Sequence, residues 1–241
     1  MKIAVLTTET PHHIYFVREI KKIFDDVIVF SETQNLVAPF ETYHSFEGMR
    51  DEFECNEWFH GQEMKISEYA KVYSFSSMNE EAAIQTLKKE NADLVLVFGT
   101  GLLKSNLIRV CPNNIFNLHG GDPENYRGLD SHLWAIYHRD FSSLVTTLHR
   151  VDPTLDAGDI VLQGQIPLTQ EMGLHKLRSL NTQLCVQLAV TLIDMCSRNG
   201  KLVSRRQRQA GRYYSFMPSV LKSICYKNFE KFIKGDRECE A

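Results

Sequence analysis

Short apolar runs alternate with segments of helical periodicity along this chain, and the alternation restricts the folds open to it. Residues 3–6 form a continuous apolar run, and residues 27–30 form a second one. Between the two runs, Ile14, Val17 and Ile20 recur at the spacing of one helix face. A strand, a helix and a second strand in this order predict a β-α-β unit, in which the helix connects two parallel strands.

The alternation continues over most of the chain, although residues 32–77 carry no clear pattern. Further strands are expected at residues 93–99, 115–118, 144–151 and 160–168, and helices at residues 79–90, 131–138 and 174–198. Asn79 and Ser131 are the expected N-caps of the first two helices, and Asn199-Gly200 is the expected stop of the third. We predict an α/β fold, an open and mostly parallel twisted sheet with helices on both faces.

Chain length and composition indicate one main domain. With 241 residues, of which 43% are hydrophobic, the chain can bury one substantial core and a small appendage. We therefore expect one domain over residues 1–200 and a C-terminal extension, a strand pair and a helix, over residues 201–241.

The expected extension is basic and aromatic. Eight basic residues and no acidic ones lie between Asp194 and Glu230, and Tyr213, Tyr214 and Phe216 are interleaved with them. Such a segment can contact nucleic acid or a nucleoside diphosphate. A solvated strand pair with an aromatic inner face, at a dimer interface, explains the same pattern and is the interpretation we favour.

Charge and cysteine content argue against several classes of protein. A formal net charge of −3 makes nucleic acid an unexpected partner and disfavours capture by anionic membranes. No apolar run approaches the ~20 residues of a membrane span, and the first residues begin a strand at once, so we expect neither membrane insertion nor a signal peptide. The six cysteines form no Cys-x-x-Cys pair, which indicates reduced thiols in a cytoplasmic protein.

Two short motifs carry polar residues that can perform chemistry. Asn117 and His119 end one expected strand, and Asp156 lies in a turn just before another. Ligands on open parallel sheets lie beyond the carboxyl ends of the strands, where both motifs fall. An imidazole beside an amide and a carboxylate can move a proton and stabilise an oxyanion, as acyl transfer requires. Taken singly, each residue has a structural explanation, as a turn cap, a strand-end histidine or an Asx turn.

These motifs resemble those of the folate-dependent formyltransferases, which include glycinamide ribonucleotide transformylase, methionyl-tRNA formyltransferase and the sugar N-formyltransferases. The matching features are Asn117-x-His119, Gly128 within residues 125–128, and Asp156-Ala157-Gly158-Asp159-Ile160 followed by a strand. The resemblance covers residues 90–170 most closely. It implies a Rossmann-like fold and transfer of a formyl group from N10-formyltetrahydrofolate to an amine, with no metal.

The resemblance also implies roles for the polar residues. His119 takes the proton of the amine or donates to the oxyanion, Asn117 hydrogen-bonds the oxyanion, and Asp156 orients the imidazole and favours its charged form. Which residue performs each proton transfer stays open. The folate is expected against the loop after the central strand and the turn before Asp156, held mainly by backbone groups. The expected donor contacts are Phe98, Gly99, Thr100, Gly101, Leu102, Leu103, Asp152 and Leu155.

Three acceptors can be weighed. A glycinamide ribonucleotide enzyme of this family cradles phosphate in a glycine-rich first loop, whereas residues 7–13 here contain no glycine. A methionyl-tRNA enzyme has a further C-terminal domain of about a hundred residues, more than follow Gly200. We therefore expect a nucleotide-linked amino sugar, and residues 211–218 resemble the tails of sugar N-formyltransferases. The expected acceptor contacts are Thr8, Glu9, His12, His13, Gly120, Gly121, Asp122, Tyr126 and Arg127.

The loop after His119 departs from the family pattern. Many relatives carry Ser-Leu-Leu-Pro at this point, and this chain has Gly120-Gly121-Asp122-Pro123. Other functions therefore stay open: transfer to another small amine, hydrolysis of formyltetrahydrofolate, or a non-catalytic folate- or nucleotide-binding module. A homodimer is the assembly that the resemblance implies.

Overall fold

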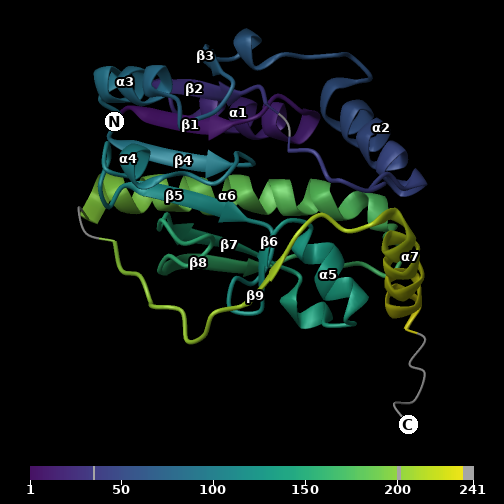
Figure 1. The fold of residues 1–241 in the computed structure, drawn as a ribbon. Helices are drawn as coiled ribbons and strands as arrows, with labels where there is room; N and C mark the ends of the chain where they lie inside the picture. Colours follow the sequence, from purple (N-terminus) through teal and green to yellow (C-terminus); the bar gives the residue numbers. More distant parts are fainter. Residues whose placement is uncertain (35, 200–201, 236–241) are drawn as a thin grey trace.

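One sheet organises the molecule (Figure 1). The computed structural model describes residues 1–34, 36–199 and 202–235, and within them seven strands form this sheet, in the order β3-β2-β1-β4-β5-β7-β8. The strands are β1 (Ile3–Thr7), β2 (Val27–Glu32), β3 (Lys71–Phe75), β4 (Leu94–Phe98), β5 (Ile115–His119), β7 (Val145–Arg150) and β8 (Ile160–Gln165). Strands β3, β2, β1, β4 and β5 are parallel, whereas β7 is antiparallel to β5 and β8 is antiparallel to β7.

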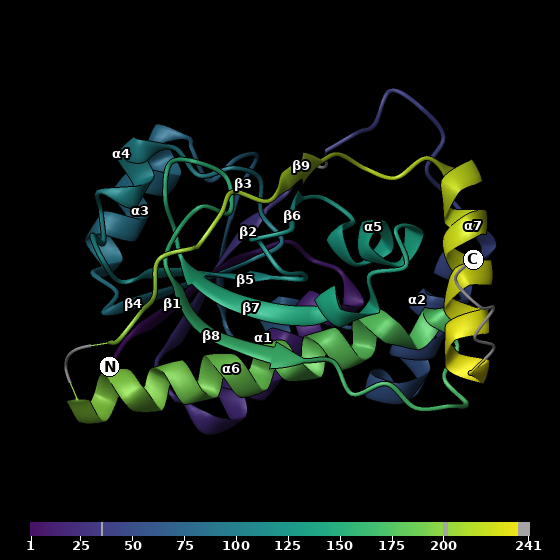
Figure 2. The same cartoon turned by 90° about the horizontal axis from the view of Figure 1, so that it is seen from below.

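Helices cover both faces of this sheet. Helices α1 and α6 pack on one face and α3 and α4 on the other, as Figure 2 shows from below. The helices are α1 (Pro11–Ile23), α2 (Ser45–Phe59), α3 (Glu81–Glu90), α4 (Ser105–Ile108), α5 (Ser131–Tyr137), α6 (Leu177–Asn199) and α7 (Ser219–Lys234), with short 3₁₀ turns at Ile66–Glu68, Phe141–Ser143 and Leu174–Lys176. Every residue of β1 and β4 is buried, as expected for parallel strands between two helix layers. The predicted α/β fold is confirmed.

Two of the predicted helix caps were wrong. Helix α3 begins at Glu81 after Glu80, and the side chain of Asn79 instead donates to Leu102 O and accepts from the Lys104 amide, which ties two loops together. Ser131 is the first residue of α5 rather than its cap, and its hydroxyl donates to Gly128 O. The predicted stop of α6 at Gly200 lies outside the described residues.

Helix α2 and the edge strand β3 occupy the segment in which the sequence showed no pattern. A capping box starts α2, because the His44 side chain accepts from Phe46 N and the Glu47 side chain accepts from His44 N. Two partly buried ion pairs then hold this helix in place: Glu54 pairs with Arg178 of α6, and Glu47 pairs with Lys222 of α7.

The tail after residue 202 runs back across the body of the molecule. Its strand β9 (Arg212–Tyr214) pairs in parallel with β6 (Tyr126–Gly128), so the tail forms its strand pair with the body of the chain. The ring of Tyr214 stacks on Trp134 of α5 at a centroid distance of 4.8 Å. The division into two units near residue 200 stays a prediction. None of the helices in the described part of the chain is long and apolar enough to cross a membrane.

Candidate active site

Antiparallel pairing of β5 and β7 brings two histidines and an amide to one edge of the sheet. Asn117 of β5 lies opposite His149 of β7, and His119 lies opposite Thr147. Strand β5 runs parallel to β4, and Asn117 and His119 lie in its C-terminal half. They are therefore at the edge of the sheet where ligands of such folds bind, beyond the carboxyl ends of the parallel strands. Both histidines are buried.

The turn between β7 and β8 carries Asp156 to the same place. Asp156 has a left-handed backbone conformation with φ of 49°, which few residues other than glycine adopt without cost. A Cβ atom on Gly158 would lie 1.7 Å from Arg150 O, so only glycine fits at that position. The Asp156 carboxylate accepts from the Gly128 amide at 2.9 Å and from Asn117 Nδ2 at 3.4 Å.

Backbone carbonyl groups fix the proton position on each imidazole ring. His119 Nε2 lies 2.9 Å from Tyr126 O, and a carbonyl oxygen only accepts, so Nε2 carries the hydrogen. Nδ1 of His119, 3.7 Å from Asp156 Oδ2, is then the basic nitrogen of the neutral ring. His149 donates from Nδ1 to Arg150 O at 2.8 Å, which leaves its Nε2 3.5 Å from Asp156 Oδ1.

The Asp156 carboxylate is held ionised. Burial alone would raise the pKa of Asp156, but the nearby His119 and His149 rings and the Gly128 amide outweigh burial and hold the pKa well below its usual range. A carboxylate in this state stabilises positive charge on an adjacent imidazole. His119 can therefore take up a proton at Nδ1 with the resulting cation beside Asp156.

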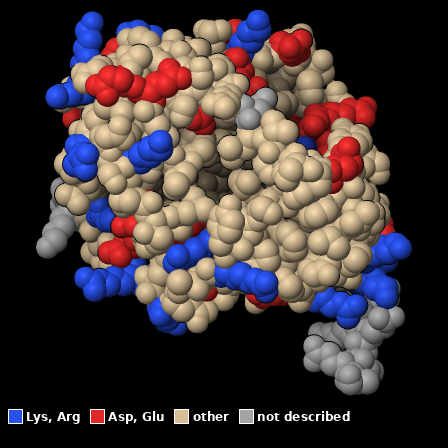
Figure 3. Space-filling view, in the orientation of Figure 1, with Lys and Arg blue, Asp and Glu red and all other residues tan. Residues whose placement is uncertain are grey.

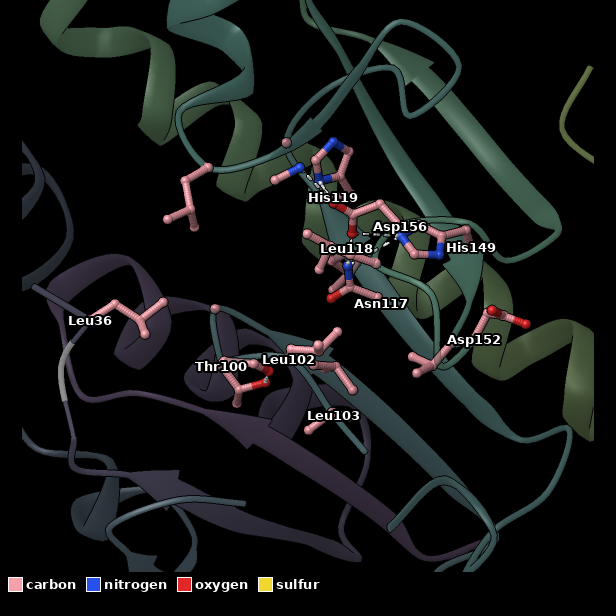
Figure 4. A pocket seen from close by; sticks show the side chains of 18 of the residues that line it. Leu36, Thr100, Leu102, Leu103, Asn117, Leu118, His119, His149, Asp152 and Asp156 are labelled. Carbon is pink, nitrogen blue, oxygen red and sulfur yellow. Dashed lines mark hydrogen bonds and ion pairs between the residues drawn. The ribbon is translucent and has the colours of Figure 1, made fainter. Parts of the chain in front are cut away.

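One polar end of the Asn117 amide, its Oδ1 atom, has no hydrogen-bond partner among the residues that the structure describes. Its Nδ2 faces His149 Nε2 at 3.2 Å and Asp156 Oδ1 at 3.4 Å, so the Oδ1 atom points towards the open cavity (Figure 4). This oxygen can accept a hydrogen bond from an incoming N–H group. Donation to an oxyanion, the role predicted from the sequence, requires a hydrogen of Nδ2 to leave its present partners.

The polar cluster faces a cavity of about 380 Å³. The space-filling view shows a hollow where β4 and β5 end, and the visible surface around its mouth is mostly of residues other than lysine, arginine, aspartate and glutamate (Figure 3). Its volume and its mixture of apolar side chains with a few polar groups are typical of a small-molecule site. The lining residues are Leu36, Val97, Gly99, Thr100, Gly101, Leu102, Leu103, Asn117, Leu118, His119, Gly120, Gly128, Leu129, His149, Val151, Asp152, Leu155, Asp156 and Tyr213.

The structure brings most of the predicted donor contacts together with the polar cluster. The lining includes residues 99–103, Asp152 and Leu155, along with Gly120. Among the described residues, the amides of Leu102 and Leu103 donate no hydrogen bond, so they are available to a ligand. Phe98 is outside the lining, because its ring packs against His13 at a centroid distance of 4.8 Å.

Several predicted acceptor contacts lie outside this cavity and are occupied with other partners. The Thr8 hydroxyl lies 2.8 Å from His13 Nδ1, the Thr10 hydroxyl lies 2.9 Å from His12 Nδ1, and Glu9 accepts from the Ile66 amide.

The remaining predicted acceptor contacts belong to the loop after His119 and to β6. The Gly121 carbonyl oxygen accepts a hydrogen bond from the Thr147 hydroxyl. The side chain and the carbonyl oxygen of Asp122 accept hydrogen bonds from the backbone amides of residues 124–126. Tyr126 contributes its carbonyl oxygen to His119, and the side chain of Arg127 bonds to Gln207. These residues therefore support the cavity rather than line it.

Sequence reasoning missed His149 and Tyr213 as site residues. The alternation over residues 144–151 did place His149 on one face with Thr147, and a histidine opposite Asn117 in an antiparallel pair was the available signal. Tyr213 belongs to the aromatic segment of the tail, but nothing in the sequence indicates that β9 lies beside β6. Leu36 and Leu129 carried no signal.

The fold and site together define an α/β protein with an amide, an imidazole and a carboxylate gathered over a cavity at the carboxyl edge of its sheet. The family model described as formyl transferase matches residues 1–184, and the chain belongs to this family.

Individual relatives agree with this membership. The chain is 30% identical over 138 residues to a methionyl-tRNA formyltransferase of Agathobacter rectalis, a match that covers 55% of this chain and 44% of the relative. The chain spans about half the length of the curated relatives it matches.

Two solved structures share the fold at low sequence identity. A 4-N formyltransferase from Francisella tularensis has a TM-score of 0.60 at 15% identity and covers 93% of this chain and 86% of its own. A formyltransferase from Anoxybacillus kamchatkensis, in complex with UDP-4,6-dideoxy-4-formamido-L-AltNAc and tetrahydrofolate, has a TM-score of 0.52 at 17% identity and covers 89% of this chain and 86% of its own.

Proposed function

We propose that this protein transfers a formyl group from N10-formyltetrahydrofolate to the amine of a nucleotide-linked amino sugar. The observation that carries the proposal is the position of His119 Nδ1 beside Asp156, at the wall of a cavity that Asn117 also faces. The complex of the Anoxybacillus kamchatkensis relative with tetrahydrofolate supports a folate as the donor.

The residues of the cavity fit a folate ring. Leu102, Leu103 and Leu155 supply apolar surface for a flat heteroaromatic ring, and the free amides of Leu102 and Leu103 can donate to its ring nitrogens and oxygen. Gly99 holds a φ of 87°, which turns the loop sharply after β4 and brings its backbone against the cavity. The folate supplies the formyl group.

The polar cluster would then serve the incoming amine. Asn117 Oδ1 accepts one N–H and so directs the nitrogen lone pair towards the formyl carbon. As the new C–N bond forms, His119 takes the second proton at Nδ1, and the Asp156 carboxylate stabilises the imidazolium ion. The bond between the formyl carbon and N10 of the folate then breaks, and N10 takes up the proton from the imidazolium ion as tetrahydrofolate leaves. Negative charge on the formyl oxygen is met by an N–H donor, from Asn117 or from a protonated ring.

The N-terminus of α1 argues against a glycinamide ribonucleotide acceptor. Pro11 has no amide hydrogen and the His13 amide donates to Thr10 O, so two of the amides at this helix start cannot donate to a phosphate. The Glu9 carboxylate adds negative charge beside them. A nucleotide-linked sugar is supported by the product held in the Anoxybacillus kamchatkensis structure.

An acceptor panel tests the proposal. Purified protein is mixed with N10-formyltetrahydrofolate and, separately, with nucleotide-linked 3-amino and 4-amino sugars, glycinamide ribonucleotide and methionyl-tRNA, and release of tetrahydrofolate is followed by absorbance. We expect release only with an amino sugar. Release of tetrahydrofolate with methionyl-tRNA would instead identify methionyl-tRNA as the acceptor, as in the name of the sequence relatives.

Two other outcomes would reject transfer altogether. Release without any amine would identify a formyltetrahydrofolate hydrolase. Tight folate binding without release under any condition would identify a binding module. The His119→Gln variant is the matched control for release of tetrahydrofolate, because glutamine keeps the size and a polar end of the side chain but lacks the basic nitrogen.

We also expect a homodimer located in the cytoplasm. Sedimentation equilibrium tests the assembly, and cell fractionation tests the location. A monomer across the accessible concentration range would remove the first expectation.

A further inference from the structure

The tail of the chain holds the turn that carries Asp156. Gln207 Nε2 donates to the carbonyl oxygens of Asp156 at 2.7 Å and Gly158 at 2.9 Å. Both hydrogens of the Gln207 amide are thereby used on the segment whose backbone is left-handed at Asp156. A left-handed residue other than glycine persists only where its surroundings fix it, and Gln207 supplies such fixation.

The other end of the Gln207 side chain connects to the strand that binds the carboxylate. Gln207 Oε1 accepts from the guanidinium of Arg127 at 2.8 Å, and Arg127 directly precedes Gly128 in β6. The Gly128 amide donates to Asp156 Oδ2 at 2.9 Å. Gln207 therefore joins the backbone of the Asp156 turn to the strand that binds the Asp156 side chain. Arg127 only donates, so the orientation of the Gln207 amide is fixed.

The tail is anchored on both sides of Gln207 by bonds that do not involve its side chain. Arg205 and Ile160 exchange two backbone hydrogen bonds, at 2.8 and 2.9 Å. Beyond Gln207, β9 pairs with β6, and the Leu129 amide donates to Tyr214 O at 2.9 Å. A substitution of Gln207 therefore leaves the tail attached, which separates loss of this side chain from loss of the whole segment.

We propose that Gln207 is a positioning residue for the reaction, which acts by holding the Asp156 turn at the distance from His119 that proton transfer requires. Gln207 lies beyond residue 184, where the match to the formyl transferase family model ends, and it reaches the site from the tail of the chain. The role in turnover rests on the proposed formyl transfer, whereas the effect on Asp156 does not.

Titration of the Asp156 carboxyl group tests the proposal without any substrate. Protein labelled with ¹³C at aspartate side-chain carboxyl carbons is titrated by NMR, and Asp156→Asn identifies the signal. His119, His149, the Gly128 amide and Asn117 Nδ2 face this carboxylate, and the first three keep the pKa of Asp156 low in the parent. In Gln207→Ala we expect the pKa of Asp156 to rise by about one pH unit or more, because the turn moves from these partners.

Two further variants distinguish the hydrogen bonds that the Gln207 amide donates from the space that its side chain fills. Gln207→Glu preserves shape and the bond from Arg127 but loses both donors, so it should behave like Gln207→Ala. Gln209→Ala removes bonds to Glu124 O and Asn125 Oδ1 that do not reach the Asp156 turn, and it should titrate like the parent.

Turnover gives a second measurement once an acceptor is found. We expect Gln207→Ala and Gln207→Glu to lower kcat by about 10- to 100-fold, because small misplacements of catalytic groups have effects of this size. A parental Asp156 titration in Gln207→Glu, or an equal change in Gln209→Ala, would overturn the positioning role. Absence of activity in the parent would reject the proposed function and leave the titration result standing.

Discussion

His149 Nε2 lies 3.5 Å from Asp156 Oδ1, and the other oxygen of the same carboxylate faces His119. The two oxygens of one carboxylate thus each face a different imidazole ring. Both rings turn their unprotonated nitrogen to the carboxylate, but His149 Nε2 also lies 3.2 Å from Asn117 Nδ2, which can donate to it. His119 Nδ1 has no hydrogen-bond partner among the described residues. The two rings should therefore contribute unequally to catalysis.

Replacement of each histidine by glutamine measures this difference. His119→Gln should lower kcat by about 10²- to 10⁴-fold, the usual contribution of a general base. His149→Gln should lower kcat by about tenfold, because it removes a neighbour that helps to hold Asp156 and Asn117 in place. Steady-state kinetics with saturating donor decides the matter. Equal losses in the two variants would mean that His149 shares the proton transfer.

Asn117→Ala removes the amide that faces the cavity. We expect kcat to fall by about 10²-fold or more, as when one polar group at a reacting carbonyl is lost. The melting temperature should change little, since this side chain is only partly buried. Kinetics and a thermal melt on the same preparation test both parts. A variant with near-parental turnover would exclude Asn117 from the reaction.

Gly99→Ala should disturb both stability and donor binding. A Cβ atom at Gly99 would lie 2.2 Å from His13 Nε2, and the residue has a φ of 87°. Gly235→Ala is the matched control, because Gly235 has a φ of 74° but no neighbouring atom within 4 Å of the place that a Cβ would take. The control should lose about 1–2 kcal/mol from backbone strain alone.

Crowding against His13 adds to this cost at Gly99. We expect a further loss of about 1–3 kcal/mol, typical of an overpacked position. Urea denaturation of both variants gives the two free energies of unfolding. Equal losses would show that the histidine ring moves aside freely.

Acidification should destabilise the protein through buried neutral histidines. Burial lowers the pKa of His13 to about 3, and Arg178 adds to the effect; burial also lowers the pKa of His132 to about 4. Because these values lie below those of the unfolded chain, the unfolded state binds more protons as the pH falls. Stability is therefore complete above about pH 6.5 and is lost below it.

The size of this effect can be measured by urea denaturation at pH 7 and pH 5. Each such histidine should remove about 2 kcal/mol of unfolding free energy between these pH values. His13→Gln cannot titrate, so the variant should lose correspondingly less on acidification, whatever its stability at pH 7. An unchanged pH dependence would show that His13 is not neutral in the folded protein.

The sequence predicted the central strands because they are buried on both faces. Such strands need continuous apolar runs, and β1 and β4 have them. Edge strand β3 is only partly buried, and α2 buries the charged Glu54 against Arg178, so neither follows a simple apolar pattern. Local composition cannot reveal a partner that lies far along the chain.

The sequence indicated site residues where reactive side chains lie at the ends of expected strands. Asn117, His119 and Asp156 carried a pattern that could be recognised, and the structure places them within hydrogen-bonding or ion-pair distance of common partners. The predicted acceptor contacts stay a prediction, and two of them, Thr8 and His13, lie within hydrogen-bonding distance of each other in the first loop. Gln207 and Tyr213 could not be predicted, since the pairing of β9 with β6 depends on tertiary structure.

The pairing of β9 with β6 also sets the order in which this protein matures on the ribosome. Domains fold progressively as the chain is synthesised, from the N-terminal end. His119, His149 and Asp156 have all been synthesised before Gln207 and β9 exist, so a nascent chain can hold its reactive groups without the segment that aligns them. The aligned site can therefore form only after the ribosome has synthesised the chain through β9, about sixty residues beyond Asp156.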